Sequence, residues 1–80
     1  MSEALLTHVA GPVVKARRKG SFTLGEAIGV GPDALLGEVV RLTDTDLTAQ
    51  VYEDTTGLAP GDTVTGHGLP LSVPLGPHLL

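Results

Sequence analysis

The chain has 80 residues, with no cysteine, no tryptophan, one phenylalanine and one tyrosine. A single domain of this length has no disulfide and no thiolate metal site to reinforce it, so aliphatic side chains must form its core. The formal net charge of −4 argues against a general nucleic-acid binder, which needs a basic surface to displace the counterions of phosphate groups.

The composition favours short strands joined by tight turns. Glycine and proline contribute 11 and 6 residues, which is high for a helical domain and natural for a β domain. Residues 1–6 have neither the basic start nor the apolar run of a secretory signal, and no segment approaches the length of a membrane span. We therefore expect a cytoplasmic protein or one that is peripheral to a membrane.

The N-terminal half predicts three strands. Residues 5–10 are mostly apolar and stop at a Gly-Pro turn signal. Residues 13–18 place Val14 and Ala16 on one face and basic side chains on the other, which is the period-two pattern of a half-buried strand. A third strand follows at 24–30, where bulky residues alternate with glycine and alanine so that one face is nearly bare.

The second half predicts the centre of the sheet and then its edge. Residues 35–42 are almost continuously apolar, and Gly37 is expected to form a β-bulge there. A polar hairpin loop leads into an alternating strand at 47–51. Residues 63–66 form a short strand, and residues 69–75 alternate again as an edge strand, because a proline within them lacks an amide donor.

These elements predict an all-β fold without a helix of useful length. We expect one domain over residues 1–80, a small closed six- to seven-stranded β-barrel, because closure removes exposed strand edges. Large-to-small changes in its core typically cost about 2–5 kcal/mol. The side chains predicted to be buried are Val40, Leu42, Val51, Val64, Leu71 and Val73.

An acidic, hydroxyl-rich loop follows the strand that ends at 51, within the stretch 50–58. Asp54 precedes two threonines, a pattern that typically caps a turn through hydrogen bonds from side chain to backbone. Gly57 and Gly61 are predicted to adopt turn conformations. Glu53 and Asp54 diverge on a strand, so they are not expected to act as an acid/base pair across a substrate bond.

No motif in the sequence predicts a catalytic, cofactor-binding or metal-binding residue. Residues 20–27 have the glycine spacing of a phosphate-binding P-loop, but Glu26 and Ala27 stand where that loop needs its lysine and hydroxyl. The three histidines have no partner at a metal-ligand spacing, and the acidic residues lack the spacing of an EF-hand. No nucleophile elbow is present.

Four of the five basic residues cluster in one strand and its turn: Lys15, Arg17, Arg18 and Lys19. One interpretation is a surface that meets an anion or an acidic partner, most naturally at a protein interface. The other is a solvated strand face with a charged turn, because adjacent residues point to opposite faces and no aromatic is interleaved for base stacking. The sequence leaves both interpretations open.

Several segments together resemble one protein family. They are Ala10-Gly11-Pro12-Val13-Val14, Gly37 to Leu42, Gln50 to Leu58, Gly61 to Val64 and Gly68 to Pro77. They resemble the N-terminal domain of the catalytic A subunit of V/A-type rotary ATPases and ATP synthases. The resemblance covers nearly the whole chain. It is strong from Gly37 onward and looser between Arg17 and Leu36.

The resemblance implies a β-barrel that alternates with B-subunit barrels in a crown, which ties the catalytic ring together at the end away from the membrane. In that family the P-loop, the catalytic carboxylate and the arginine finger, with ATP and magnesium, belong to later domains. We therefore expect an assembly domain that lacks the downstream nucleotide-binding domain and has no ATPase activity of its own.

The expected partners are the B-subunit barrels, with no nucleic acid and no direct membrane insertion. In isolation the domain is expected to be a monomer. The resemblance implies a cytoplasmic location, peripheral to the membrane in the head of a proton- or sodium-translocating machine. The alternative is a free-standing small barrel that binds a protein or peptide by adding a strand at an edge.

Overall fold

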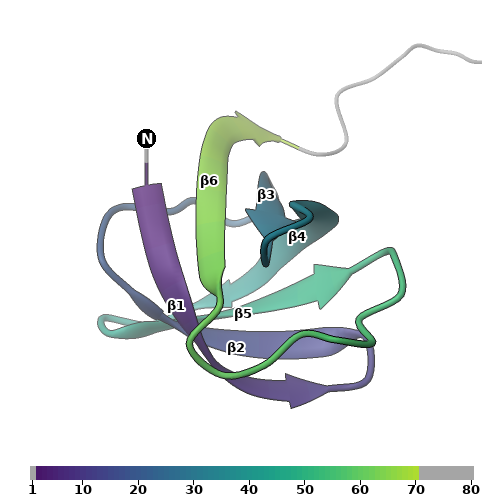
Figure 1. Ribbon diagram of the computed structural model, residues 1–80. Coiled ribbons are helices and arrows are strands. Elements are labelled where there is room, and N and C mark those ends of the chain that lie inside the picture. The colour runs from purple at the N-terminus through teal and green to yellow at the C-terminus, as the bar shows by residue number, and fades with distance from the viewer. Residues whose placement is uncertain (1, 71–80) are drawn as a thin grey trace, which may run out of the picture.

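A computed structural model describes residues 2–70, which form a closed antiparallel barrel (Figure 1). The strands are β1 (Ser2–Ala10), β2 (Val13–Arg18), β3 (Glu26–Val30), β4 (Leu35–Leu42), β5 (Asp46–Val51) and β6 (Thr63–Pro70). They are hydrogen-bonded in the order β1-β2-β5-β4-β3-β6, and β6 pairs back with β1. The predicted all-β closed barrel is confirmed, with six strands in the described part of the chain.

The strand predictions differ from the structure mainly near β6. The bounds of β2 and β4 match the predicted strands, whereas β1 begins at Ser2 rather than at residue 5 and β3 begins at Glu26 rather than at residue 24. The prediction of separate strands at 63–66 and 69–75 is wrong as far as Pro70, because β6 continues through an irregular step in its pairing with β3. Residues 71–75 lie outside the described residues.

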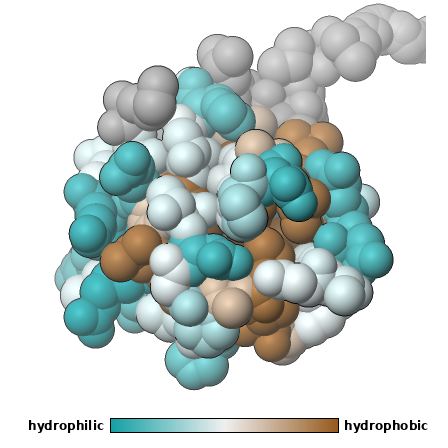
Figure 2. Space-filling model, in the orientation of Figure 1, coloured by the Kyte–Doolittle hydropathy of each residue, from teal (hydrophilic) through white to brown (hydrophobic). Residues whose placement is uncertain are grey.

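The core lies inside the barrel and draws on every strand. Its buried apolar side chains are Ala4, Leu6, Val14, Ala16, Phe22, Ile28, Val30, Val39, Leu47, Ala49, Val51 and Val64. The chain's one phenylalanine therefore belongs to this core, and aliphatic residues fill the remainder. On the face turned toward the viewer, hydrophobic residues reach the surface among hydrophilic ones (Figure 2).

Two predicted core residues are confirmed and one is wrong. Val51 and Val64 are buried, and Leu42 is partly buried against the core. Val40 is instead 47% exposed. Leu71 and Val73, also predicted to be buried, lie outside the described residues.

A β-bulge explains why Val40 and Leu42 do not share a face, as the prediction required. Val39 pairs with Ala49 of β5, but the next pair joins Arg41 to Thr48, so β4 carries one extra residue. Val40 points outward because it follows the inward Val39, and the extra residue keeps Arg41 outward as well and returns Leu42 to the core side.

The predicted bulge at Gly37 is wrong, because this residue pairs regularly with both neighbouring strands. A Cβ atom at Gly37 would lie 2.9 Å from the backbone oxygen of Gln50. Close backbone approach, rather than a change of register, is therefore the reason for glycine at this position.

Candidate interaction surface

The barrel wall made of β2, β5 and β4 presents a mixed apolar and charged surface. On β5, Leu47, Ala49 and Val51 face the core, so the residues between them point outward. We name this surface the outer wall. Its residues are Val13, Lys15, Arg17, Leu36, Glu38, Val40, Arg41, Asp46, Thr48, Gln50 and Tyr52.

Cross-strand pairs order the outer wall into rows. From the end at the β4–β5 hairpin, the rows are Arg17 with Asp46, then Lys15 with Thr48 and Arg41, then Val13 with Gln50 and Glu38. Beyond them, the backbone amide of Tyr52 donates to the oxygen of Leu36. Cations therefore gather near the hairpin, and apolar side chains with a carboxylate lie at the other end.

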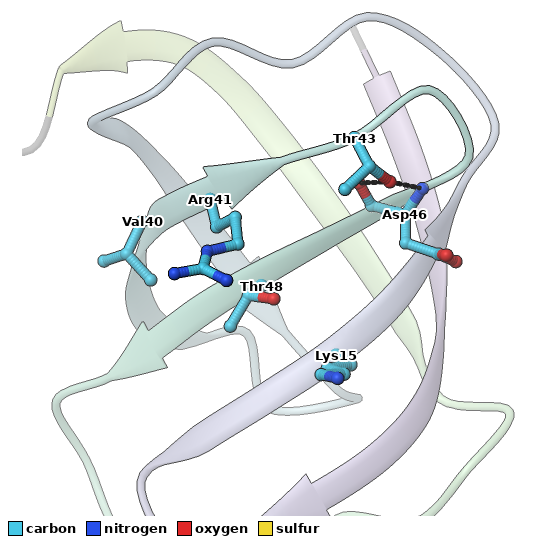
Figure 3. A pocket seen from close by; sticks show the side chains of 6 residues that line it. All are labelled: Lys15, Val40, Arg41, Thr43, Asp46 and Thr48. Carbon is cyan, nitrogen blue, oxygen red and sulfur yellow. Dashed lines mark hydrogen bonds between the residues drawn. The ribbon is translucent and has the colours of Figure 1, made fainter.

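A groove of about 550 Å³ lies over the row that contains Thr48 (Figure 3). We name it the cationic groove, and its lining residues are Lys15, Val40, Arg41, Thr43, Asp46 and Thr48. Hydrogen bonds between Thr43 and Asp46 hold the hairpin end of the groove. The backbone amide of Asp46 donates to Thr43 Oγ1 at 2.9 Å, and Thr43 Oγ1 donates to the backbone oxygen of Asp46 at 3.2 Å. Fixed strands and a closed turn thus position the groove.

The structure divides the basic cluster that the sequence contains. Lys15 and Arg17 are exposed on the outer wall, and Lys19 is exposed on the turn after β2. Arg18 has a different role, because its guanidinium donates to the backbone oxygens of Thr43 and Gly20 at 2.5 and 3.3 Å. Arg18 therefore joins the end of β2 to the β4–β5 hairpin.

Arg41 is the groove residue that sequence reasoning missed. It is separated from the basic cluster in sequence, and only the pairing of Arg41 and Lys15 with Thr48 brings the two cations to one row. Simple alternation after Val39 would have pointed Arg41 into the core. The signal that could have found it is the penalty for burying an unpaired guanidinium, which favours a bulge just before it.

The far end of the outer wall is acidic, and its carboxylates bond nearby groups. Tyr52 Oη donates to Glu38 Oε1 at 2.7 Å, and the Leu36 amide donates to Glu53 Oε2 at 2.5 Å. The hydrogen bond to Glu38 raises the pKa of Tyr52 above its ordinary value of 10.0, and burial and the charge of Glu38 act in the same direction. Both carboxylates thus support the start of β4.

Comparisons with known proteins identify the family of this barrel. The model of the ATP synthase alpha/beta family, beta-barrel domain, matches residues 6–68. The chain belongs to this family. The resemblance to the N-terminal barrel of the A subunit is thereby confirmed.

Three relatives show how much of a longer protein the chain matches. It is 51% identical over 73 residues to the A subunit of the A-type ATP synthase of Ignicoccus hospitalis, covering 91% of this chain and 12% of the relative. Over 80 residues, all of this chain, it is 41% identical to the V-type ATP synthase alpha chain of Thermoanaerobacter sp. strain X514 and 44% identical to the catalytic A subunit of the V-type proton ATPase of Cyanidium caldarium. It spans 14% of the length of each of these two.

The acidic loop of this family barrel is built as predicted. Asp54 Oδ1 accepts hydrogen bonds from the hydroxyl and the amide of Thr56 at 2.7 and 2.9 Å, which hold the pKa of Asp54 below its ordinary value of 3.8. Gly57 and Gly61 have φ angles of +98° and +99°, so their predicted turn conformations are confirmed. Thr55 Oγ1 donates to the oxygen of Gly11 at 2.9 Å and ties the loop to the β1–β2 turn.

A buried carboxylate is the other feature that sequence reasoning missed. Glu26 is 5% exposed; its Oε1 accepts from the Thr23 amide at 2.9 Å and its Oε2 from the Gly68 amide at 2.8 Å. Oε2 lies so close to Gly66 that a Cβ there would come within 2.5 Å. The signal was present in the sequence, since Glu26 shares the face of Ile28 and Val30 on β3.

A second cavity, of about 370 Å³, lies beside this carboxylate and is lined by Ser2, Ser21, Thr23, Glu26, Gly66, His67 and Gly68. Within residues 2–70, no group of three side chains is arranged to hold a metal ion, and no helix is long and apolar enough to cross a membrane. His8 and His67 are exposed on β1 and β6, and His78 lies outside the described residues. The absence of catalytic, cofactor and metal sites stays a prediction.

Proposed function

We propose that the chain is an assembly domain, the barrel of the A subunit of a V/A-type rotary ATPase. In this role it binds the barrels of neighbouring B subunits and holds the alternating ring together. The family match over residues 6–68 and the names of the relatives support the parent machine. Residues 1–80 then form one domain of a longer, ion-translocating subunit.

The observation that carries the assembly role is the apolar exposure of the outer wall. Five large hydrophobic side chains are exposed in the described part of the chain, and four of them lie on this wall: Val13, Leu36, Val40 and Tyr52. Charged side chains surround them. Exposed apolar groups with a polar surround are typical of protein interfaces, where aromatic residues and arginine are enriched.

The remaining activities of the parent protein belong, in this proposal, to its other domains. ATP and magnesium bind downstream, and ATP is hydrolysed or synthesised there while the head stays in the cytoplasm at the membrane periphery. We expect no ATP turnover by the chain alone. Release of phosphate from ATP by the purified chain, above that of a Glu26→Gln variant and a buffer control, would contradict this.

Sedimentation velocity tests the assembly role directly. The chain is mixed with the corresponding barrel of the B subunit from the same genome, over a range of concentrations. We expect a faster-sedimenting complex that neither component forms alone, whereas an unrelated small β-barrel mixed with the chain gives none. Absence of the complex at the highest concentration would overturn the proposal.

The free-standing, peptide-binding alternative has less support. Strand addition needs an unpaired sheet edge. In the described part of the chain each of the six strands pairs with two others, because the barrel closes through β1 and β6.

A further inference from the structure

We propose that the cationic groove is the docking site for carboxylate side chains of the neighbouring barrel. This inference rests on the proposed assembly function and assigns it a surface, an occupant and a chemistry. The occupant is an acidic segment of the B-subunit barrel, which inserts between Lys15 and Arg41 and covers the exposed side chain of Val40.

The first argument comes from the free cations. Within residues 2–70 no hydrogen bond or ion pair involves the side chain of Lys15 or of Arg41, although the backbones of both residues are paired with β5. The one carboxylate that lines the groove belongs to Asp46, which lies in the adjacent row opposite Arg17 and accepts a hydrogen bond from Thr45 Oγ1 at 3.0 Å. The row of Thr48 therefore has two cations and no carboxylate of its own.

The second argument is the geometry of that row. Lys15 and Arg41 flank Thr48 on two sides, so their Cα atoms lie roughly 10 Å apart, twice the spacing between adjacent strands. A carboxylate placed over Thr48 is within reach of both long side chains, and the Thr48 hydroxyl can donate to it as well. The three residues form a preformed receptor for one or two carboxylates.

The third argument is that the groove is cationic whereas the whole chain carries a net negative charge. The chain has a net charge of −4, so a cationic area on it attracts acidic partners while the remaining surface repels them. Complementary charges of this kind steer association and fix the relative register of two proteins. The groove therefore determines where an acidic neighbour docks.

The β4 bulge indicates that the occupant is a protein rather than a free anion. It directs Val40 outward beside Arg41, where a regular strand would show one side chain fewer. An exposed valine contributes nothing to the binding of a small anion in an open groove. It does contribute when a protein surface covers it and removes its methyl groups from water.

Charge reversal tests the inference. The double variant Lys15→Glu with Arg41→Glu is titrated with the B-subunit barrel, and Lys19→Glu, on the exposed turn outside the groove, is the control. We expect the double reversal to weaken the dissociation constant by at least about tenfold, and the control to change it by less than about twofold. The milder pair Lys15→Gln with Arg41→Gln, expected to flatten the salt dependence of binding, keeps the test valid if the reversal does not fold.

Each outcome decides between the two proposals. If the parent chain does not bind the B-subunit barrel, both are overturned. If it binds and the double reversal binds equally well, the groove is not the docking site, although the assembly role stands. The inference also fails if the double variants abolish self-association of the chain and leave its binding to the B-subunit barrel unchanged. It fails as well if inorganic phosphate binds the groove without competing with the B-subunit barrel.

Discussion

Of the three irregular steps in the described barrel, the one in β4 and the one in β6 have opposite structural consequences. In β4 the extra residue directs side chains outward, and Val40 is 47% exposed. In β6 three residues lie opposite one residue of β3, and Gly68, at a φ of +74°, turns its amide toward the buried Glu26. The first exposes side chains on the outer wall, and the second requires a polar partner inside the protein.

The energetic consequences differ accordingly. Burying a carboxylate is unfavourable unless hydrogen bonds replace its water, and both oxygens of Glu26 accept a backbone amide. Removal of the carboxylate leaves those amides without an acceptor, which costs more than the hydrogen bonds contribute to stability. Side chains at the β4 bulge face water, so changing them has little effect on stability and a direct effect on binding.

The largest effect on stability is expected for Glu26→Leu. The substitution leaves the partly buried amides of Thr23 and Gly68 without an acceptor, at about 1–3 kcal/mol for each, so we expect a loss of about 2–6 kcal/mol. This is a large part of the stability of a domain of this size. Urea denaturation followed by circular dichroism measures it.

Glu26→Gln is the graded control for this prediction. Its amide group has one oxygen, so it can replace only one of the two acceptors, and the expected loss is about half as large. A Leu variant as stable as the parent would show that the β6 step does not depend on the buried carboxylate.

Deletion of Val40 tests whether the barrel needs the extra residue of β4. Without it, Arg41 and Leu42 follow Val39 in regular alternation and keep their pairing with β5, so Arg41 stays outward and Leu42 inward, and we expect stability to change by less than about 1 kcal/mol. Val40→Thr keeps the bulge, and at an exposed site it should change stability by less than about 0.5 kcal/mol. Thermal melts of the two variants separate the backbone effect from the side-chain effect.

A deletion variant that melts far below the parent would mean that the pairing of β4 with β5 requires the extra residue. The bulge would then stabilise the barrel itself, and the contrast between the two irregular steps would be lost.

The two steps also differ in what the sequence reveals. Local alternation correctly predicts the two faces of β2 and of β5, because side-chain direction follows from position along a strand. It does not reveal a bulge, because register depends on pairing with a strand elsewhere in the chain. The predicted bulge at Gly37 is wrong for this reason, and so is the predicted burial of Val40.

The candidate surface was accessible to sequence reasoning only in part. Lys15 and Arg17 stand in the visible basic cluster, but Arg41 joins them through β5, across two strand pairings. The Gly68 amide that completes the Glu26 site is likewise 42 positions away. Contacts between residues this distant in sequence follow from barrel closure and not from any local pattern.

An effect smaller than that of Glu26→Leu is expected for Gly68→Ala, with Gly57→Ala as its matched partner. Both glycines have left-handed φ angles, +74° and +98°, and a Cβ added at either position would meet no heavy atom within 4 Å. Backbone strain alone should therefore cost about 1–2 kcal/mol at each site. Urea denaturation measures the loss of unfolding free energy in each variant. A larger loss in Gly68→Ala than in Gly57→Ala would show that the hydrogen bond from the Gly68 amide to Glu26 is disturbed, and equal losses would show that this bond survives.

The smallest effect concerns the outward-facing carboxylate of β4, Glu38. Its hydrogen bond raises the pKa of Tyr52 above 10.0, so the neutral phenol is favoured in the folded state. The bond therefore stabilises the fold fully below pH 10, and this contribution is lost as the pH rises through the folded-state pKa. Because the chain has one tyrosine and no tryptophan, phenolate absorbance follows Tyr52 alone.

Glu38→Gln should lower the pKa of Tyr52 toward its ordinary value, because the amide oxygen is an uncharged and weaker acceptor. Glu3→Gln, on the exposed face of β1 and without a bond to Tyr52, is the control and should leave the titration unchanged. An unshifted titration in Glu38→Gln would mean that this contact does not hold in solution. Water alone would then solvate the carboxylate of Glu38 on β4, whereas backbone amides bind the buried carboxylate of Glu26 on β3.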